Sequence, residues 1–482
     1  MQQNILGCVI APVFISNLRT IAHFGVSQNY SPISVGSTMK VVMALFFTAI
    51  AFNAVTASAQ STGASVSYSL NDCLKIATSQ NFDIQIAKAR LRTATADVQG
   101  AFGQFLPSVT FSMGYQRRLN ADGGGQFNLP DGYSSPANSY SMNFGAQYML
   151  FNGFSRESNY SRAQSTVSSL EYNTQSVSLQ TKYLIWQQFI AILKNGQIVK
   201  ARRENLELGN NELKRAKARQ EAGVTAIATV YAQEADNGTR ELDLVQSENQ
   251  MNLAKATLLT TMGHNPAQTA DFTESSLASD VSDNEIAGFR MEVGSIDAAI
   301  SHAIEKRPDY AAAKQRIKAS ESSLEGSRSG YYPTLSANGG WSWQNTQFDN
   351  FSKFGSSTVG LSLRVPIFEN FNTNTQIQSA KLELTQREIE QLQLEQTLKS
   401  QIQSAFLNLT SAEKQLEITS RVIRSAQQNY NSAQERFNVG AASVTDYLTA
   451  NTQLINAKIN RISAVYNYFE AQSQMRYALG DL

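Results

Sequence analysis

The chain has 482 residues, of which 42% are hydrophobic and nine are proline, and its formal net charge is +1. Its length suggests about two to four compact domains, but the abundance of Gln, Asn, Ser and Ala favours long, wet helices or a molecule completed by copies of itself. The nearly neutral balance of charge excludes nucleic acid as a bulk partner.

The N-terminal region predicts an exported protein. A lysine follows Met39, and an apolar run ends in the small residues Ala57-Ser58-Ala59. This pattern is typical of a signal peptide, assigned here to residues 39–59. Residues 1–38 precede it and are expected to be a non-native upstream extension. A lipoprotein site at Cys8 is the alternative, disfavoured because no Lys or Arg precedes it.

The rest of the chain is internally duplicated. Pro107 and Pro333 lie 226 residues apart, and Gly223 and Gly440 lie 217 residues apart, with similar neighbours in each pair. Such constant offsets predict two copies of one unit, and the nine-residue change falls where a loop is expected. The expected order is a first repeat, a linker and a second repeat, over residues 60–269, 270–295 and 296–482.

Each repeat is expected to begin with a short helix and a longer one, the longer spanning 80–104 or 306–329 and ending before a proline. Cys73, in the opening helix, is expected to be a small buried residue. Two segments of alternating apolar and polar residues follow in each repeat. Each predicts a strand near the ~9–11 residues that cross a bilayer, with aromatic residues at the membrane interfaces. The strand segments are 109–116, 140–148, 335–343 and 359–365, and the interface residues are Tyr115, Tyr140, Tyr148, Trp341 and Trp343.

Four strands cannot close a membrane sheet, because closed barrels begin at about eight strands and open edges are not tolerated in lipid. No segment after the signal peptide reaches the ~18–20 apolar residues of a spanning helix. The strands therefore predict an oligomer, with a dimer, trimer or tetramer all possible. A soluble sandwich is the alternative, but four strands at two separate places form a poor core.

Two proline-free segments, 154–221 and 372–438, are each long enough for a helix of roughly 100 Å. From Ile402 to Phe437, apolar and alanine residues recur at steps of three and four, the repeat of a coiled coil.

Gly223 and Gly440 suit the position after a helix end. Return helices are expected over 226–262 and 443–478. Each repeat thus predicts an antiparallel coiled-coil hairpin, and both tips should lie at the end away from the membrane.

Together these features resemble the TolC-like outer-membrane efflux protein family over about residues 66–480. No single motif is specific, but their order at constant offsets is. The motifs are Leu70-Asn71-Asp72-Cys73-Leu74, Leu106-Pro107, Tyr332-Pro333, Leu150-Phe151-Asn152-Gly153, Arg219 to Gly223 and Arg436 to Gly440.

The resemblance implies a mainly α fold with a small β part. Three chains of four strands each would form a 12-stranded outer-membrane β-barrel in contact with outer-membrane lipid, continued by a long α-helical coiled-coil periplasmic tunnel. Its place would be the outer membrane of a Gram-negative bacterium. It would be the passive channel of a tripartite efflux or type I secretion system, served by an inner-membrane pump and a periplasmic adaptor protein.

The resemblance also implies an acidic ring at the tunnel entrance, formed by Asp446, six residues after Gly440. Three copies would favour cations and raise the pKa of the carboxylate. The family's second acid is Thr449 here and its basic partner is Ala442, so a weaker ring is expected and a locking salt bridge is in doubt. Thr229 is the equivalent of Asp446 in the first repeat. The alternative is that Asp446 is a first-turn acid favoured by the helix dipole.

The same resemblance assigns adaptor docking to the hairpin tips, at Arg219, Gly223, Arg436 and Gly440. The alternative reading is that each arginine complements the helix dipole and each glycine ends its helix, and both readings can hold.

No enzyme, metal or cofactor site is expected. His264 and His302 lie in different repeats and have no ligand spacing. The alternative function is a secreted structural coiled-coil protein of the cell surface, which the four strands disfavour. A passive uptake channel is disfavoured because it needs no long helices.

Overall fold

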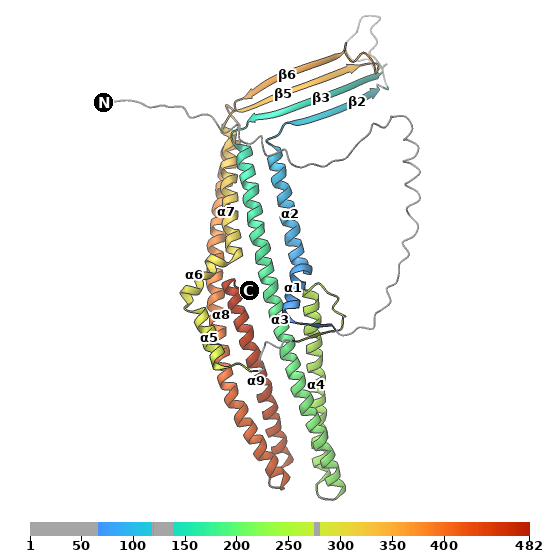
Figure 1. Ribbon diagram of the computed structural model, residues 1–482, viewed down its shortest axis with the longest axis vertical. Coiled ribbons are helices and arrows are strands. Elements are labelled where there is room, and N and C mark those ends of the chain that lie inside the picture. Colours follow the sequence, from blue (N-terminus) through green and yellow to red (C-terminus); the bar gives the residue numbers. More distant parts are fainter. Residues whose placement is uncertain (1–65, 118, 120–137, 274–279) are drawn as a thin grey trace, which may run out of the picture. The chain divides into compact units, whose positions relative to one another are not determined.

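The computed structural model describes residues 66–117, 119, 138–273 and 280–482, and the same series of elements occurs twice along them (Figure 1). The signal peptide and the upstream extension lie outside the described residues. The first series is β1 (Val66–Tyr68), α1 (Leu70–Gln80), α2 (Phe82–Gly103), β2 (Ser108–Arg117), β3 (Asn138–Phe151), α3 (Ser155–Glu221) and α4 (Ile227–Thr261). The second series is β4 (Ala270–Phe272), α5 (Asp283–Val293), α6 (Ile296–Lys306), α7 (Pro308–Ser327), a 3-10 turn (Arg328–Tyr331), β5 (Thr334–Asn345), β6 (Gly355–Arg364), α8 (Asn372–Asn438) and α9 (Val444–Leu479). The predicted duplication is therefore confirmed.

The long helices α3 and α8 have 67 residues each and begin and end within one residue of the predicted bounds. Each follows a phenylalanine in the left-handed region, Phe154 at φ 66° and Phe371 at φ 62°. This conformation is uncommon outside glycine. Aromatic contacts accompany it: Phe154 meets Phe151 edge-on at 5.4 Å, and Phe371 meets Phe368 at 5.8 Å between ring centroids. These turns, which the sequence analysis did not predict, redirect the chain from strand to helix.

The predicted coiled-coil stripe of α8 forms the seam with α9. Ile402 and Leu409 are completely buried and share one apolar cluster with Tyr468 and Met475 of α9. A fully buried large apolar side chain stabilises a fold by roughly 1.5–3 kcal/mol. A second cluster joins α1, α3 and α4 to β1 and β4, and its most buried members are Cys73, Ile185, Phe189, Leu258 and Met262. Cys73 is thus buried, as predicted.

Strands β2, β3, β5 and β6 form one antiparallel sheet in that order, with β2 and β6 at its edges. The register pairs Phe111 with Phe144 and Phe144 with Trp341 on one face. Ser112 pairs with Asn143 on the other. The predicted separation into an apolar and a polar face is confirmed. In the described part of the chain, no helix combines the length and apolarity needed to cross a membrane.

Trp343 departs from its predicted place at a membrane interface. It lies on the apolar face, but only 1% of its surface is exposed. Phe348 and Phe351, from the turn between β5 and β6, pack over it with ring centroids at 5.7 and 4.6 Å. Alternation along a strand places a residue on a face and does not reveal a turn folding back onto it. Tyr115, by contrast, remains exposed.

The segment expected to be a linker, 270–295, contains β4 and α5. β4 pairs in parallel with β1, which ties the start of the first repeat to the end of its hairpin. Phe289 and Val293 of α5 join the apolar cluster of α8 and α9, and Arg290 pairs with Glu413 of α8 at 2.7 Å. The segment therefore packs against the second hairpin as well as connecting the repeats. Its acidic, Ser-rich composition masked these two apolar contacts.

Candidate functional site

The two hairpin tips share one backbone arrangement. Gly223 has φ 71° and Gly440 has φ 76°. The N–H of the residue after each glycine donates to the carbonyl of Arg219 or Arg436, at 2.8 Å in both tips. This is the Schellman arrangement, in which glycine is favoured because a Cβ is strained at positive φ. The arginines thus complete the turns through their backbones, while their side chains stay exposed.

Asp446, at the third position of α9, caps its own helix. Its carboxylate accepts hydrogen bonds from the hydroxyl of Ser443 at 2.8 Å and from the backbone N–H of Ser443 at 3.1 Å. The Ser443 hydroxyl accepts in return from the N–H of Asp446. These bonds, and to a lesser degree the charge of Arg436, hold the pKa of Asp446 below its ordinary value. In the single chain Asp446 is therefore a capping acid, and its gate role stays a prediction about an assembly.

The other predicted gate positions are separated. Thr449 is exposed one turn further along α9, whereas Thr229 is half-buried in α4. Thr229 and Arg219 line a small cleft at the first tip, which Phe437 of α8 also lines. The structure thus brings together two residues that the sequence assigned to different sites. Asp446 does not line this cleft.

An aromatic cluster that sequence reasoning missed holds the start of α9 against α8. Tyr447 is 1% exposed, stacks on Phe437 at 5.2 Å between centroids, and has its hydroxyl 3.3 Å from that of Tyr430. Burial raises the pKa of Tyr447. Because Tyr447 directly follows Asp446, this packing fixes the helical turn that carries the carboxylate. Tyr430 and Phe437 belong to the predicted stripe, but their partner on the return helix was not identifiable.

One face of the four-stranded sheet exposes large apolar side chains over all four strands. Val359 is 94% exposed, Leu361 73% and Phe111 64%. Further exposed members of this face are Val109, Met113, Tyr115, Phe144, Tyr148 and Leu363. A contiguous apolar surface of this kind marks an interaction with a membrane or a partner.

Groups that carry chemistry are sparse. The described residues contain no cluster of three or more His, Cys, Asp or Glu able to hold a metal ion. His264 packs edge-on against Tyr68, and Nε2 of His302 lies 2.8 Å from the carboxylate of Asp481 near the C-terminus. Each histidine thus has a local structural partner.

Known proteins share this organisation. A family model described as outer membrane efflux protein matches residues 73–264 and 299–481. The outer membrane efflux protein BepC of Brucella suis biovar 1 (strain 1330) is 22% identical over 422 residues, which is 86% of each chain. The Campylobacter jejuni CmeC outer membrane channel aligns with a TM-score of 0.71 at 17% identity, over 86% of this chain and 85% of that chain. VceC of Vibrio cholerae aligns with a TM-score of 0.71 at 16% identity, over 85% and 96%. The structural likeness concerns the fold, and the two ranges matched by the family model fall one in each repeat.

Proposed function

The chain belongs to the outer membrane efflux protein family, and from that membership we propose that three copies of it form one passive conduit from the periplasm to the exterior. The protein is an outer-membrane efflux channel. In the proposed system an inner-membrane pump supplies the energy, and a periplasmic adaptor protein joins the pump to the conduit.

The observation that carries the trimer is the exposed apolar sheet face together with its two edge strands. In lipid, the backbone groups of an open edge have no partners, and each unsatisfied group costs several kcal/mol. Strands β2 and β6 have ten residues each, so β6 of one copy can pair with β2 of the next. Three copies joined in this way would close a wall of twelve strands, with the apolar face toward lipid.

The opposite face of the sheet supports a water-filled interior. Its paired positions carry small or uncharged polar side chains, with Arg364 at the end of β6 as an exception. Such a lining offers hydrogen bonds without fixed charge. This suits a conduit that passes varied substrates rather than one that selects a single ion.

At the opposite end of the helices, we propose that Asp446 narrows the entrance with one carboxylate from each copy, Thr449 and Thr229 being neutral neighbours. The tips, with Arg219 and Arg436 exposed just before Gly223 and Gly440, are the proposed docking surface for the adaptor. Exposed side chains on a fixed turn support this proposal.

The trimer is tested by a pair of neighbouring substitutions in β6. Val359→Arg places a charge on the apolar face, where it should cost about 2–4 kcal/mol per copy in lipid and prevent insertion. Thr358→Arg places the same charge on the polar face and should leave assembly intact. Light scattering in detergent should give the mass of three chains for the unchanged protein and for Thr358→Arg, and these should conduct ions in planar bilayers. A stable, water-soluble single chain, or equal behaviour of the two variants, would contradict the proposal.

A further inference from the structure

A buried polar network lies within the first hairpin, two to three turns from its tip in the sequence of α4. Nη1 of Arg240 donates to the backbone carbonyl of Asn205 at 2.9 Å and to its Oδ1 at 3.3 Å, while Nε donates to Asp236 at 2.6 Å. Arg240 is only 4% exposed, so its charge is compensated inside the hairpin by Asp236. Asn205 is thereby held in place independently of the second hairpin.

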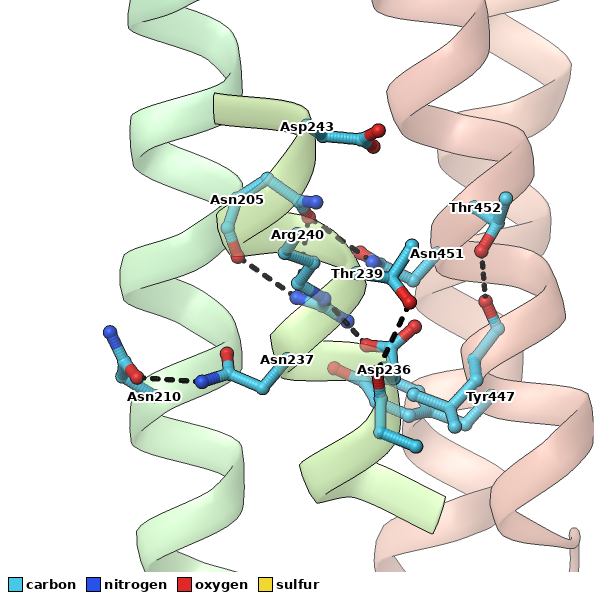
Figure 2. A network of polar contacts seen from close by, with 12 residues as sticks. Asn205, Asn210, Asp236, Asn237, Thr239, Arg240, Asp243, Tyr447, Asn451 and Thr452 are labelled. Carbon is cyan, nitrogen blue, oxygen red and sulfur yellow. Dashed lines mark hydrogen bonds and ion pairs between the residues drawn. The ribbon is translucent and has the colours of Figure 1, made fainter. Parts of the chain in front are cut away.

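Asn451 of α9 reaches this network from the second hairpin. Its Nδ2 donates to Oδ1 of Asn205 at 3.2 Å, and Asn451 itself is 4% exposed. Figure 2 shows Asn451 pointing from α9 toward Asn205 and Arg240. Among the described residues, no other side-chain hydrogen bond joins α3 or α4 to α8 or α9. We name this contact, Asn451 to Asn205, the inter-hairpin bond.

The surroundings of the inter-hairpin bond are polar. Gln233, on the same helix as Arg240, is 4% exposed, and its Oε1 has no hydrogen-bond partner within the described chain. Leu208 of α3 supplies an apolar contact to Tyr430, Tyr447 and Leu454 of the second hairpin. Polar groups that separate can exchange their bonds for water, whereas an apolar seam of the same area resists separation. This contact is therefore suited to breaking and reforming.

The position of the inter-hairpin bond links it to the entrance. Asn451 follows Asp446 by five residues on α9, which is about 7.5 Å along a helix. A helix is stiff over this distance, so the distance of Asn451 from Asn205 determines where Asp446 stands relative to the first hairpin.

On the premise of the proposed function, we propose that the inter-hairpin bond between Asn451 and Asn205, presented by Arg240, holds α9 in its closed position and so positions Asp446. Arg240 and Asn205 are then positioning residues. Their complex stays intact when α9 moves, because Arg240 and Asp236 belong to the first hairpin. Opening of the entrance breaks only the bond to Asn451, which water replaces.

The test compares two asparagine substitutions of the same kind in planar bilayers. Asn451→Leu keeps the size of the side chain and removes the inter-hairpin bond, and it should shift the closed-to-open ratio toward open by about five-fold per chain. Asn237→Leu is the matched control. It removes a hydrogen bond of 2.9 Å to Asn210 within the first hairpin and should leave conductance unchanged (Figure 2). Both variants lose one buried asparagine contact, so thermal unfolding should move similarly in both.

A third variant should act in the opposite direction. Asn205→Asp replaces the shared acceptor by a carboxylate, which should strengthen the bonds from both Arg240 and Asn451 and lower conductance. Opposite effects at the two ends of one bond are not expected from mere loss of structure, and this arm remains decisive if Asn451→Leu does not assemble. Conductance equal in Asn451→Leu, Asn237→Leu and the unchanged protein would overturn the proposal. Failure of the unchanged protein to conduct at all would instead overturn the proposed function.

Discussion

At the scale of single residues, Asp446 is subject to two opposed influences. Within one chain, hydrogen bonds from Ser443 lower its pKa. In the proposed trimer, like charges from the other copies would raise it. The hydrogen bonds are made directly, while repulsion between copies acts through water and is screened by salt beyond about 8–10 Å. We therefore expect the capping bonds to dominate.

Asp446→Asn separates charge from capping, because its amide oxygen can still accept from Ser443. We expect the unchanged channel to be blocked by trivalent cations, and Asp446→Asn and Asp446→Ala to be relieved of that block. Since the folded pKa is depressed, the charge and the cap persist above it and are lost as pH falls through it. The block should therefore survive until pH falls below the ordinary aspartate value of about 3.9.

The control for this measurement is Asp72→Asn in α1. Asp72 forms the same capping box with Ser69, and its pKa is lowered in the same way. Its neutralisation should leave the cation block unchanged. Loss of block already above about pH 5 would show that repulsion between copies prevails. An undiminished block in Asp446→Asn would reject the gate assignment.

At the scale of helices, the location of a glycine decides its contribution. Gly440 ends α8 at φ 76°, whereas Gly238 lies inside α4. A Cβ added to either would meet no heavy atom within 4 Å, so packing does not distinguish them. Only the backbone conformation does.

Gly440→Ala should lower the stability of the hairpin by about 1–2 kcal/mol, because a side chain is strained in the left-handed region. Gly238→Ala should raise stability by about 0.8–1 kcal/mol, the difference in helix propensity. Thermal unfolding followed by far-ultraviolet circular dichroism checks both. Shifts in the same direction would contradict this account of the tips.

At the scale of the whole molecule, the described chain offers two kinds of surface for other molecules. The apolar sheet face and its edges lie at one end of the long helices, and the hairpin tips lie at the other (Figure 1). Residues from both tip regions line one cleft, among them Arg219, Phe437 and Asn438. A partner that reaches one tip is therefore within range of the other.

The adaptor proposal predicts the effect of removing both tip arginines. Arg219→Ala with Arg436→Ala should abolish capture of a purified adaptor from the same cell, while conductance and helical content stay unchanged, because the turns use only the backbones of these residues. The matched control is Arg203→Ala with Arg421→Ala, two exposed arginines further from the tips on the same helices. Equal loss of capture in both double variants would move the docking surface away from the tips.

Local periodicity was sufficient for much of this protein. Alternation along a strand sorts side chains onto two faces, and steps of three and four along α8 mark the seam with α9. Gly223 and Gly440 marked the helix ends, since positive φ selects glycine. Ser443 and Asp446 are three residues apart, so the capping box could also have been predicted from their spacing.

Contacts between distant segments were decided only by the tertiary structure. Trp343 is buried because a turn folds over it, α5 packs on α8 through Phe289, and Asn451 meets Asn205 across 246 residues of sequence. The pattern within a segment determines which face of a helix or strand is apolar or polar. Which partner covers that face depends on how the segments meet in space, and no local periodicity encodes that.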